Sequence, residues 1–164
     1  MTARPPRVAV VTGGGRGLGR GIAVALAADG FDLVLGYARD RSAAEATAGA
    51  VRAGGRRAEL VEGDVSESAT AKLLLDAATS LGGPDAWINN AGVSVLAPVV
   101  DTDEAEFARM LDVNVLGTFH GLRAAGLWFV AEGRPGRIVN LASDLGVQAC
   151  VNLGAYSATK FAVV

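Results

Sequence analysis

A glycine-rich turn near the start of the chain constrains the fold more than any other segment. The run Val8-Ala9-Val10-Val11 is apolar on both faces, and Thr12-Gly13-Gly14-Gly15-Arg16-Gly17-Leu18-Gly19 follows it. A strand that is apolar on both faces is typical of the centre of a parallel sheet covered by helices. A turn from such a strand into a helix presents free backbone N–H groups and the positive end of the helix dipole to an anion. The segment therefore predicts a central strand, a phosphate-binding turn and a helix.

The rest of the chain repeats this alternation of strand and helix. Runs rich in β-forming residues occupy 7–12, 32–37, 57–62, 85–90 and 137–142. Helical patterns separate them, and two of these end in the stop signals Gly54-Gly55 and Gly82-Gly83-Pro84. Such alternation predicts an α/β fold, a Rossmann-type doubly wound parallel sheet with strand order 3-2-1-4-5. We interpret residues 1–164 as a single dinucleotide-binding domain that is incomplete, because the usual sheet has further C-terminal strands.

Two of the predicted helices carry distinctive apolar patterns. In the first, Leu18, Ile22 and Leu26 recur every four residues, so we expect this face to pack on the sheet. The last long pattern opens with Asp103 and Glu106, which resemble a capping box. We expect that helix to bend near Asn114 and to carry an apolar stripe made of Phe107, Met110, Leu111, Leu116, Phe119 and Leu122.

Composition excludes several classes of function. The 164 residues include one cysteine and one histidine, which excludes an internal disulfide and a zinc cluster, so we expect no metal site. A net charge of −2 with interspersed signs gives no positive field for nucleic acid or anionic lipid. Polar residues interrupt every apolar run before membrane-spanning length, and residues 1–7 lack the apolar region of a signal peptide. We expect a cytoplasmic protein with a small-molecule partner.

Another informative segment lies near the end of the chain. Tyr156 and Lys160 are four residues apart, so on a helix they lie on one face. A phenol ordinarily titrates near pH 10, and a neighbouring cation favours its ionised form, which would suit acid–base work at neutral pH. Ser143 directly follows the fifth predicted strand, where sheets of this kind place their ligands.

The glycine pattern, the run Asn89-Asn90-Ala91-Gly92 and the Tyr156/Lys160 pair occur together and in order. By these motifs the chain resembles the single-domain branch of the short-chain dehydrogenase/reductase family, from residue 7 to 164. Within that branch it resembles the 3-oxoacyl-acyl-carrier-protein reductases. The resemblance implies an oxidoreductase that interconverts a ketone and a secondary alcohol by hydride transfer. Tyr156 would donate or accept the proton, while Lys160 would assist it and hold the nicotinamide ribose. Ser143 would bond the substrate oxygen, and Asn114 would hold a water in the proton relay to Lys160.

The same resemblance implies a nicotinamide cofactor. Asp64 matches the residue that contacts adenine, and Asn90 matches the residue that lines the adenosine side. The expected acidic position after the second strand holds Tyr37, whereas Arg16 and Arg39 could clasp a 2′-phosphate, so we favour NADP(H). Asp40 nearby keeps NAD(H) possible. The full set of predicted cofactor residues is Thr12, Gly13, Gly15, Arg16, Gly17, Leu18, Gly19, Tyr37, Arg39, Asp64, Val65, Asn90, Ala91, Gly92, Tyr156 and Lys160.

Each site residue also has a structural explanation. Ser143 could cap a turn, Asp64 could cap the next helix, Asn114 could lie at the surface, and the glycine turn could bind nothing. The Tyr156/Lys160 pair could be incidental on an amphipathic helix. Family members continue beyond the point that corresponds to Val164, which leaves three hypotheses for this chain. It is an oxidoreductase seen as an incomplete chain, a nucleotide-binding remnant without turnover, or an unstable product. A full-length form is expected to be a homo-oligomer, whereas the state of this chain is left open.

Overall fold

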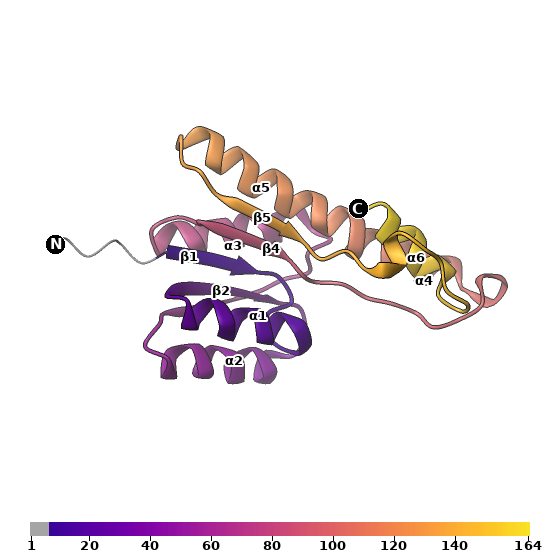
Figure 1. Ribbon diagram of the computed structural model, residues 1–164, viewed down its shortest axis with the longest axis horizontal. Helices are drawn as coiled ribbons and strands as arrows, with labels where there is room; N and C mark the ends of the chain where they lie inside the picture. Colours follow the sequence, from indigo (N-terminus) through magenta and orange to yellow (C-terminus); the bar gives the residue numbers. More distant parts are fainter. Residues whose placement is uncertain (1–6) are drawn as a thin grey trace.

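The apolar run after Arg7 forms the central strand of a parallel sheet (Figure 1). The computed structural model describes residues 7–164. Within these residues the sheet has five strands in the order β3-β2-β1-β4-β5, and every paired neighbour is parallel. The α/β class and the strand order predicted from the sequence are therefore confirmed. The strands are β1 (Arg7–Val11), β2 (Phe31–Tyr37), β3 (Ala58–Glu62), β4 (Ala86–Asn89) and β5 (Arg137–Asn140).

Helices cover both faces of the sheet (Figure 1). One face packs against α1 (Gly17–Ala28) and α2 (Arg41–Ala53), and the other against α3 (Ser68–Ser80) and α5 (Gly117–Ala131). A shorter helix, α4 (Glu104–Leu111), leads into α5, and α6 (Gly154–Phe161) packs against α4. The remaining turns are η1 (Val99–Asp101), η2 (Asp112–Leu116) and η3 (Asp144–Gly146).

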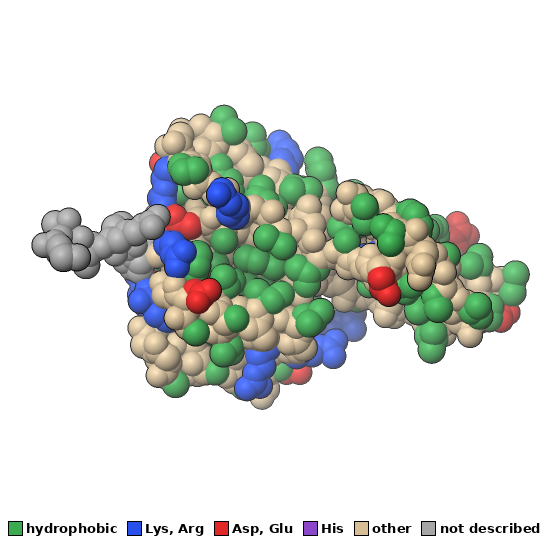
Figure 2. Space-filling model, in the orientation of Figure 1, with side chains coloured by type: hydrophobic (Ala, Val, Ile, Leu, Met, Phe, Trp, Pro, Cys, Tyr) green, Lys and Arg blue, Asp and Glu red, His purple; other side chains and the backbone are tan. Residues whose placement is uncertain are grey.

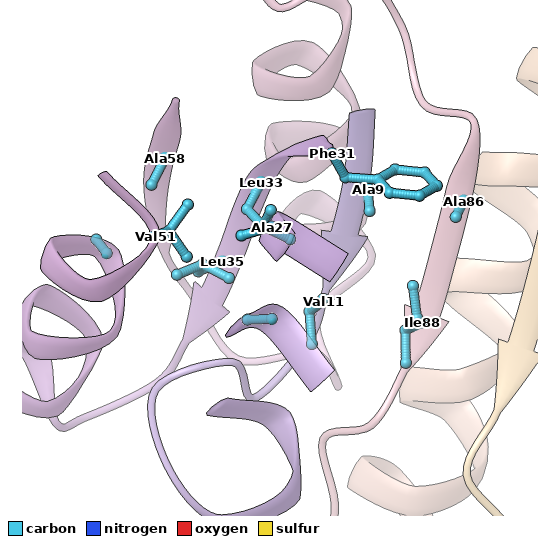
Figure 3. Packing of buried hydrophobic residues seen from close by; sticks show 12 residues of the cluster. Ala9, Val11, Ala27, Phe31, Leu33, Leu35, Val51, Ala58, Ala86 and Ile88 are labelled. Atoms are coloured by element: carbon cyan, nitrogen blue, oxygen red, sulfur yellow. The ribbon is translucent and has the colours of Figure 1, made fainter. Parts of the chain in front are cut away.

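The core consists of two apolar layers that share the central strand. Ala9 and Val11 belong to the layer that includes residues of α1 and α2, and Val8 and Val10 belong to the layer that includes residues of α3 and α5. All four of these residues are fully buried. Figure 3 shows how the first layer gathers side chains from neighbouring strands and helices around Leu33 and Leu35. Burial on both faces explains why β1 reads as a continuous apolar run.

Helix α1 packs differently from the stripe that the sequence predicts. Leu18 is 75% exposed, while Ala23 and Ala27 form the buried contact, with Ile22 and Leu26 partly buried beside them. The expectation for Leu18 is therefore wrong. Because α1 starts just beyond the carboxyl end of β1, its first turn lies over a cleft at the sheet edge, and Leu18 lines that cleft.

The long helical pattern is divided by a π-helical turn, η2, at residues 112–116. This turn contains Asn114, so the α-helix is interrupted at the place where the sequence predicts a bend. Asp103 caps α4, accepting a hydrogen bond from the Ala105 N–H at 2.7 Å. The predicted apolar stripe is buried at Met110, whereas other members are exposed: Leu111, Leu116, Phe119 and Leu122. The small residues Gly117, Gly121 and Ala125 are buried instead, which brings α5 close to the sheet.

The surface shows apolar side chains over the narrow end of the molecule, near α4 and α6 (Figure 2). Exposed apolar residues in this part of the chain include Leu96, Val99, Val100, Val147 and Val151. In residues 7–164 we find no helix with both the length and the apolar character that a membrane crossing requires. The expectation about a signal peptide concerns residues 1–7. Of these, residues 1–6 lie outside the described part of the chain.

Candidate active site and cofactor cleft

A cleft of about 670 Å³ opens beside the carboxyl ends of β1 to β4. Parallel sheets of this type bind their ligands at the carboxyl ends of their strands. Most residues that the sequence assigns to a cofactor line the cleft, namely Gly13, Gly15, Arg16, Gly17, Leu18, Gly19, Tyr37, Arg39, Asp64, Val65, Asn90, Ala91 and Gly92. The structure thus brings together residues from four separate strand ends.

The glycine turn forms one wall of this cleft with its backbone. Gly13 and Gly17 have φ angles of +63° and +53°, a conformation that glycine adopts without the cost of a Cβ. A Cβ on Gly19 would lie 2.2 Å from the Gly13 carbonyl oxygen, so only glycine fits there. Arg16, which precedes α1, does not cap the helix with its side chain. Among residues 7–164 no such cap competes for the first N–H groups of α1, which can therefore bind an anion.

Thr12 and Asn90 join the glycine turn to the end of β4. The Thr12 hydroxyl oxygen accepts hydrogen bonds from the N–H groups of Asn90 and Ala91, each at 3.0 Å. The Asn90 amide nitrogen donates to the carbonyl oxygens of Thr12 at 2.8 Å and Gly13 at 3.1 Å. Thr12 is 3% exposed and lies beneath the lining of the cleft. It holds the wall in place, while Asn90 forms part of that wall.

The end of β2 carries one tyrosine and two charged residues. The Tyr37 hydroxyl donates to a Glu62 carboxylate oxygen at 2.9 Å, and burial together with this bond raises the pKa of Tyr37. Arg39 is exposed and lines the cleft. Asp40 also lines it, but one of its oxygens accepts a hydrogen bond from the Ala43 N–H at 2.9 Å and caps α2. The Asp40 carboxylate therefore already serves as the N-terminal cap of α2.

Asp64 follows β3 and is held by three hydrogen bonds. One oxygen accepts from the N–H of Ser66 at 3.0 Å and from the Ser66 hydroxyl at 2.7 Å, and the other forms an ion pair with Arg109. Burial alone would raise the pKa of Asp64, but the bonds from Arg109 and Ser66 outweigh it and lower the pKa. Sequence reasoning missed Arg109, because 45 positions separate it from Asp64 and only the tertiary fold brings them together.

Asn114 is buried in η2, with 1% of its surface exposed, so the alternative of a surface position is wrong. Its side-chain oxygen accepts from the N–H of Val93 at 2.9 Å, and its amide nitrogen donates to the carbonyl of the same residue at 2.9 Å. The same nitrogen donates to the Thr159 hydroxyl oxygen at 2.9 Å. Asn114 therefore connects the segment after β4 with α6.

Tyr156 and Lys160 lie on α6, as the spacing predicts. The Lys160 Nζ atom lies 5.7 Å from the centroid of the Tyr156 ring and donates to the Leu141 carbonyl at 2.7 Å. Lys160 is 6% exposed, and this burial lowers its pKa. A Cβ placed on Gly92 would lie 3.8 Å from Nζ and 3.3 Å from the Asn114 side-chain oxygen. Since Gly92 lines the cleft, the Lys160 ammonium lies next to this part of the cleft wall, with the Tyr156 ring beside it.

Ser143 follows β5 and caps the short turn η3. Its hydroxyl oxygen accepts a hydrogen bond from the Leu145 N–H at 3.1 Å, and the hydroxyl donates to an Asp144 carboxylate oxygen at 2.9 Å. The alternative function of a turn cap, considered from the sequence, is thus present in the structure. A hydroxyl group has one donor and two acceptor positions, so its donor can be redirected to another oxygen.

A family model described as short chain dehydrogenase matches residues 7–164. The chain belongs to this family. It is 40% identical over 159 residues to an L-2,3-butanediol dehydrogenase of Corynebacterium glutamicum, and the match covers 96% of this chain and 62% of the relative. It is 36% identical over 158 residues to a diacetyl reductase, (S)-acetoin forming, of Staphylococcus epidermidis, with 96% and 61% covered.

Two solved dehydrogenase structures superpose closely on this fold. An NAD⁺-bound xylitol dehydrogenase matches with a TM-score of 0.90 and 35% identity, covering 96% of this chain and 60% of that one. A short-chain alcohol dehydrogenase from Sinorhizobium meliloti 1021, described as a putative one, matches with a TM-score of 0.88 and 35% identity, covering 95% and 62%. The chain thus spans about three fifths of the length of these proteins.

Proposed function

We propose that the protein is a nicotinamide-dependent oxidoreductase that interconverts a ketone and a secondary alcohol. The observation that carries the proposal is the position of Lys160, with the Tyr156 ring beside it, next to Gly92 in the wall of the cleft. The names of its relatives, a butanediol dehydrogenase and a diacetyl reductase, agree with this reaction class.

The residues of the cleft fit a dinucleotide. The free N–H groups at the start of α1 and the glycine turn would hold its pyrophosphate, and Asp64 with Val65 would hold the adenine. Arg16 and Arg39 would bind a 2′-phosphate, so we propose NADP(H) as the preferred cofactor, with NAD(H) as the alternative. When bound, the nicotinamide supplies or accepts the hydride.

The protein itself would move the proton. The Tyr156 hydroxyl would donate its proton to the carbonyl oxygen, or take one from the alcohol, and the Lys160 ammonium would stabilise the phenolate that results. The Ser143 hydroxyl would hydrogen-bond the same substrate oxygen. Asn114 would keep the Val93 segment and α6 in register, and would hold the water of the proton relay.

The test is the variant Tyr156→Phe, with acetoin plus NADPH or NADH in the reducing direction and 2,3-butanediol plus NADP⁺ or NAD⁺ in the oxidising direction. We expect the wild type to bind a reduced cofactor and to turn over, and the variant to bind it equally while turnover falls about 10²-fold to 10⁴-fold. Cofactor binding is followed by nicotinamide fluorescence and turnover by absorbance. Unchanged turnover in Tyr156→Phe would contradict the assignment of the proton donor. Binding by the wild type without turnover would favour the nucleotide-binding alternative.

A further inference from the structure

Arg109 joins the adenine side of the cleft to the helix that leads to Asn114. It lies in the last turn of α4 and lines the cleft beside Asp64 and Val65. Its guanidinium group donates through one nitrogen to Asp64 and through the other to the Ser66 hydroxyl oxygen at 3.1 Å. Because Ser66 in turn donates to Asp64 at 2.7 Å, the three side chains form a closed ring of hydrogen bonds.

The ring occupies most of the acceptor capacity of Asp64. An ionised carboxylate offers about four acceptor positions. Among the described residues, the N–H and hydroxyl of Ser66 take two positions on one oxygen, and Arg109 takes one on the other. One acceptor position is left on the oxygen that Arg109 contacts. The side chains of Arg109 and Asp64 are 38% and 35% exposed, and both residues line the cleft.

The charge of Arg109 also determines which ligand group this position accepts. The bond from Arg109 is foremost among the interactions that lower the pKa of Asp64. At neutral pH the carboxylate is therefore ionised and can accept hydrogen bonds but cannot donate one. An exocyclic amine, which donates, is favoured there. A carbonyl oxygen at the same place would meet an anion with no proton to offer.

We propose that Arg109 is a positioning residue for the cofactor, which fixes the Asp64 carboxylate so that it selects the amino group of adenine. This inference rests on the proposed function, since it assumes that the cleft binds an adenine dinucleotide. Arg109 acts through Asp64, and its removal releases the carboxylate from the ring. The Ser66 bonds alone hold only one of the two oxygens.

The experiment compares each cofactor with its deamino analogue, in which hypoxanthine replaces adenine. We expect the wild type to bind NADPH or NADH about tenfold more tightly than the matching analogue, as one hydrogen bond to a charged acceptor predicts. In Arg109→Met this ratio should fall to about twofold. Arg109→Lys keeps the charge but not the planar pair of donors, and we expect an intermediate ratio.

The control variant is Arg123→Met on α5, where the exposed Arg123 lies away from the cleft lining, and it should keep the wild-type ratio. Thermal unfolding of every variant separates folding from selectivity, and Arg109→Lys carries the test if Arg109→Met unfolds. An unchanged ratio in folded Arg109→Met, or in Arg109→Lys when it replaces that variant, would overturn the proposal. An equal loss of affinity for both ligands would overturn it too, because Arg109 would then contact the base directly. Failure of the wild type to bind NADPH or NADH would instead contradict the proposed function.

Discussion

The side-chain nitrogen of Asn114 lies 2.9 Å from the hydroxyl oxygen of Thr159, one residue before Lys160. The Thr159 hydroxyl donates to the Tyr156 carbonyl at 2.8 Å, and Thr159 is fully buried. The bond therefore ties the π-helical turn to the middle of α6. It is one of the contacts that position the helix carrying both proposed catalytic residues, beside the packing of α6 on α4 and η3.

Thr159→Val should loosen this connection without changing the volume of the side chain. An N–H of Asn114 would be left unpaired in a buried place, and we expect the free energy of unfolding to fall by about 1–3 kcal/mol. Turnover should fall more than cofactor affinity, because the cleft does not depend on α6 for its walls. Thr159→Ser keeps the hydroxyl and should restore most of the turnover. Equal stability and turnover of the Val and Ser variants, by urea unfolding and steady-state kinetics, would speak against this connection.

Gly19→Ala should damage the cofactor cleft. The added Cβ would lie 2.2 Å from the Gly13 carbonyl oxygen and 2.6 Å from the Asn90 amide nitrogen, so the turn must move. Overpacking of this kind costs about 1–3 kcal/mol, and we expect dinucleotide affinity to fall as well. The matched control is Gly21→Ala on the same helix, where a Cβ meets open space among the described residues. That change should stabilise α1 by up to about 1 kcal/mol. Thermal melts and fluorescence titrations distinguish the two variants.

The fold was predictable because its signals are local. The run Val8–Val11 is apolar on both faces, and Gly13 and Gly17 occupy backbone conformations that few other residues adopt, so strand, turn and helix follow directly from the sequence. The pattern of Leu18, Ile22 and Leu26 was misleading in part. Periodicity gives a helical face but does not say where the helix begins relative to the sheet, and Leu18 lies over the cleft.

Parts of the candidate site could not be predicted because they are non-local. Arg109 and Thr159 belong to no motif, and each makes its decisive contact 45 positions away in the chain. Ser143 was weighed as a turn cap or a substrate contact, and the structure shows the cap. Sequence spacing brings Tyr156 and Lys160 to one helical face, but only the fold places Lys160 beside Gly92.

Gly121→Ala should weaken the packing of α5 on β4. A Cβ there would lie 2.0 Å from the Asn89 side-chain oxygen and 2.6 Å from the Trp87 indole nitrogen. These two groups are hydrogen-bonded to each other at 2.9 Å in the core, so the helix must shift or the bond must break. We expect a loss of about 1–3 kcal/mol. The Cβ added by Gly126→Ala on the same helix would meet open space among the described residues, so this change should be neutral or stabilising. Urea unfolding measures both, and equal stability would contradict the close approach.

Asp32 should make stability depend on pH in the acid range. Its side chain is 2% exposed and contacts Arg56 at 2.8 Å and Arg57 at 2.7 Å. Burial alone would raise the pKa of Asp32, but the hydrogen bonds from Arg57 and the two positive charges outweigh it and lower the pKa. The folded state therefore binds the proton less tightly than the unfolded state. The resulting stabilisation is present above about pH 4 and is lost as the pH falls further, through the folded pKa.

Asp32→Asn tests this directly. At pH 7 the variant should be less stable than the wild type by about 2 kcal/mol, and the difference should shrink below about pH 4. Asp76→Asn, which breaks the exposed pair with Lys72, should cost about 0.5 kcal/mol or less. Urea unfolding between about pH 2.5 and 7 gives both differences. A difference between wild type and Asp32→Asn that stayed constant across this range would contradict the lowered pKa.

Arg16 and Arg39 should decide the choice between NADPH and NADH. Both line the cleft, and the nearby carboxylate of Asp40 is committed to capping α2 through Ala43. Replacing both arginines by Met should weaken NADPH binding about tenfold, while NADH affinity changes little, because only the 2′-phosphate requires the guanidinium groups. The NADPH preference of the wild type should also weaken with added salt, since the two arginines are exposed.

Arg20→Met is the matched control, since Arg20 is exposed on α1 away from the cleft lining. Fluorescence titrations with both cofactors give the ratio of dissociation constants for each variant. If the wild type binds NADH more tightly, the cap made by Asp40 must open to place the carboxylate near the ribose. Asp40→Asn then becomes the informative variant, because it keeps a capping oxygen but removes the charge. Loss of NADH affinity in Asp40→Asn would assign the cofactor preference to Asp40 instead of the arginines.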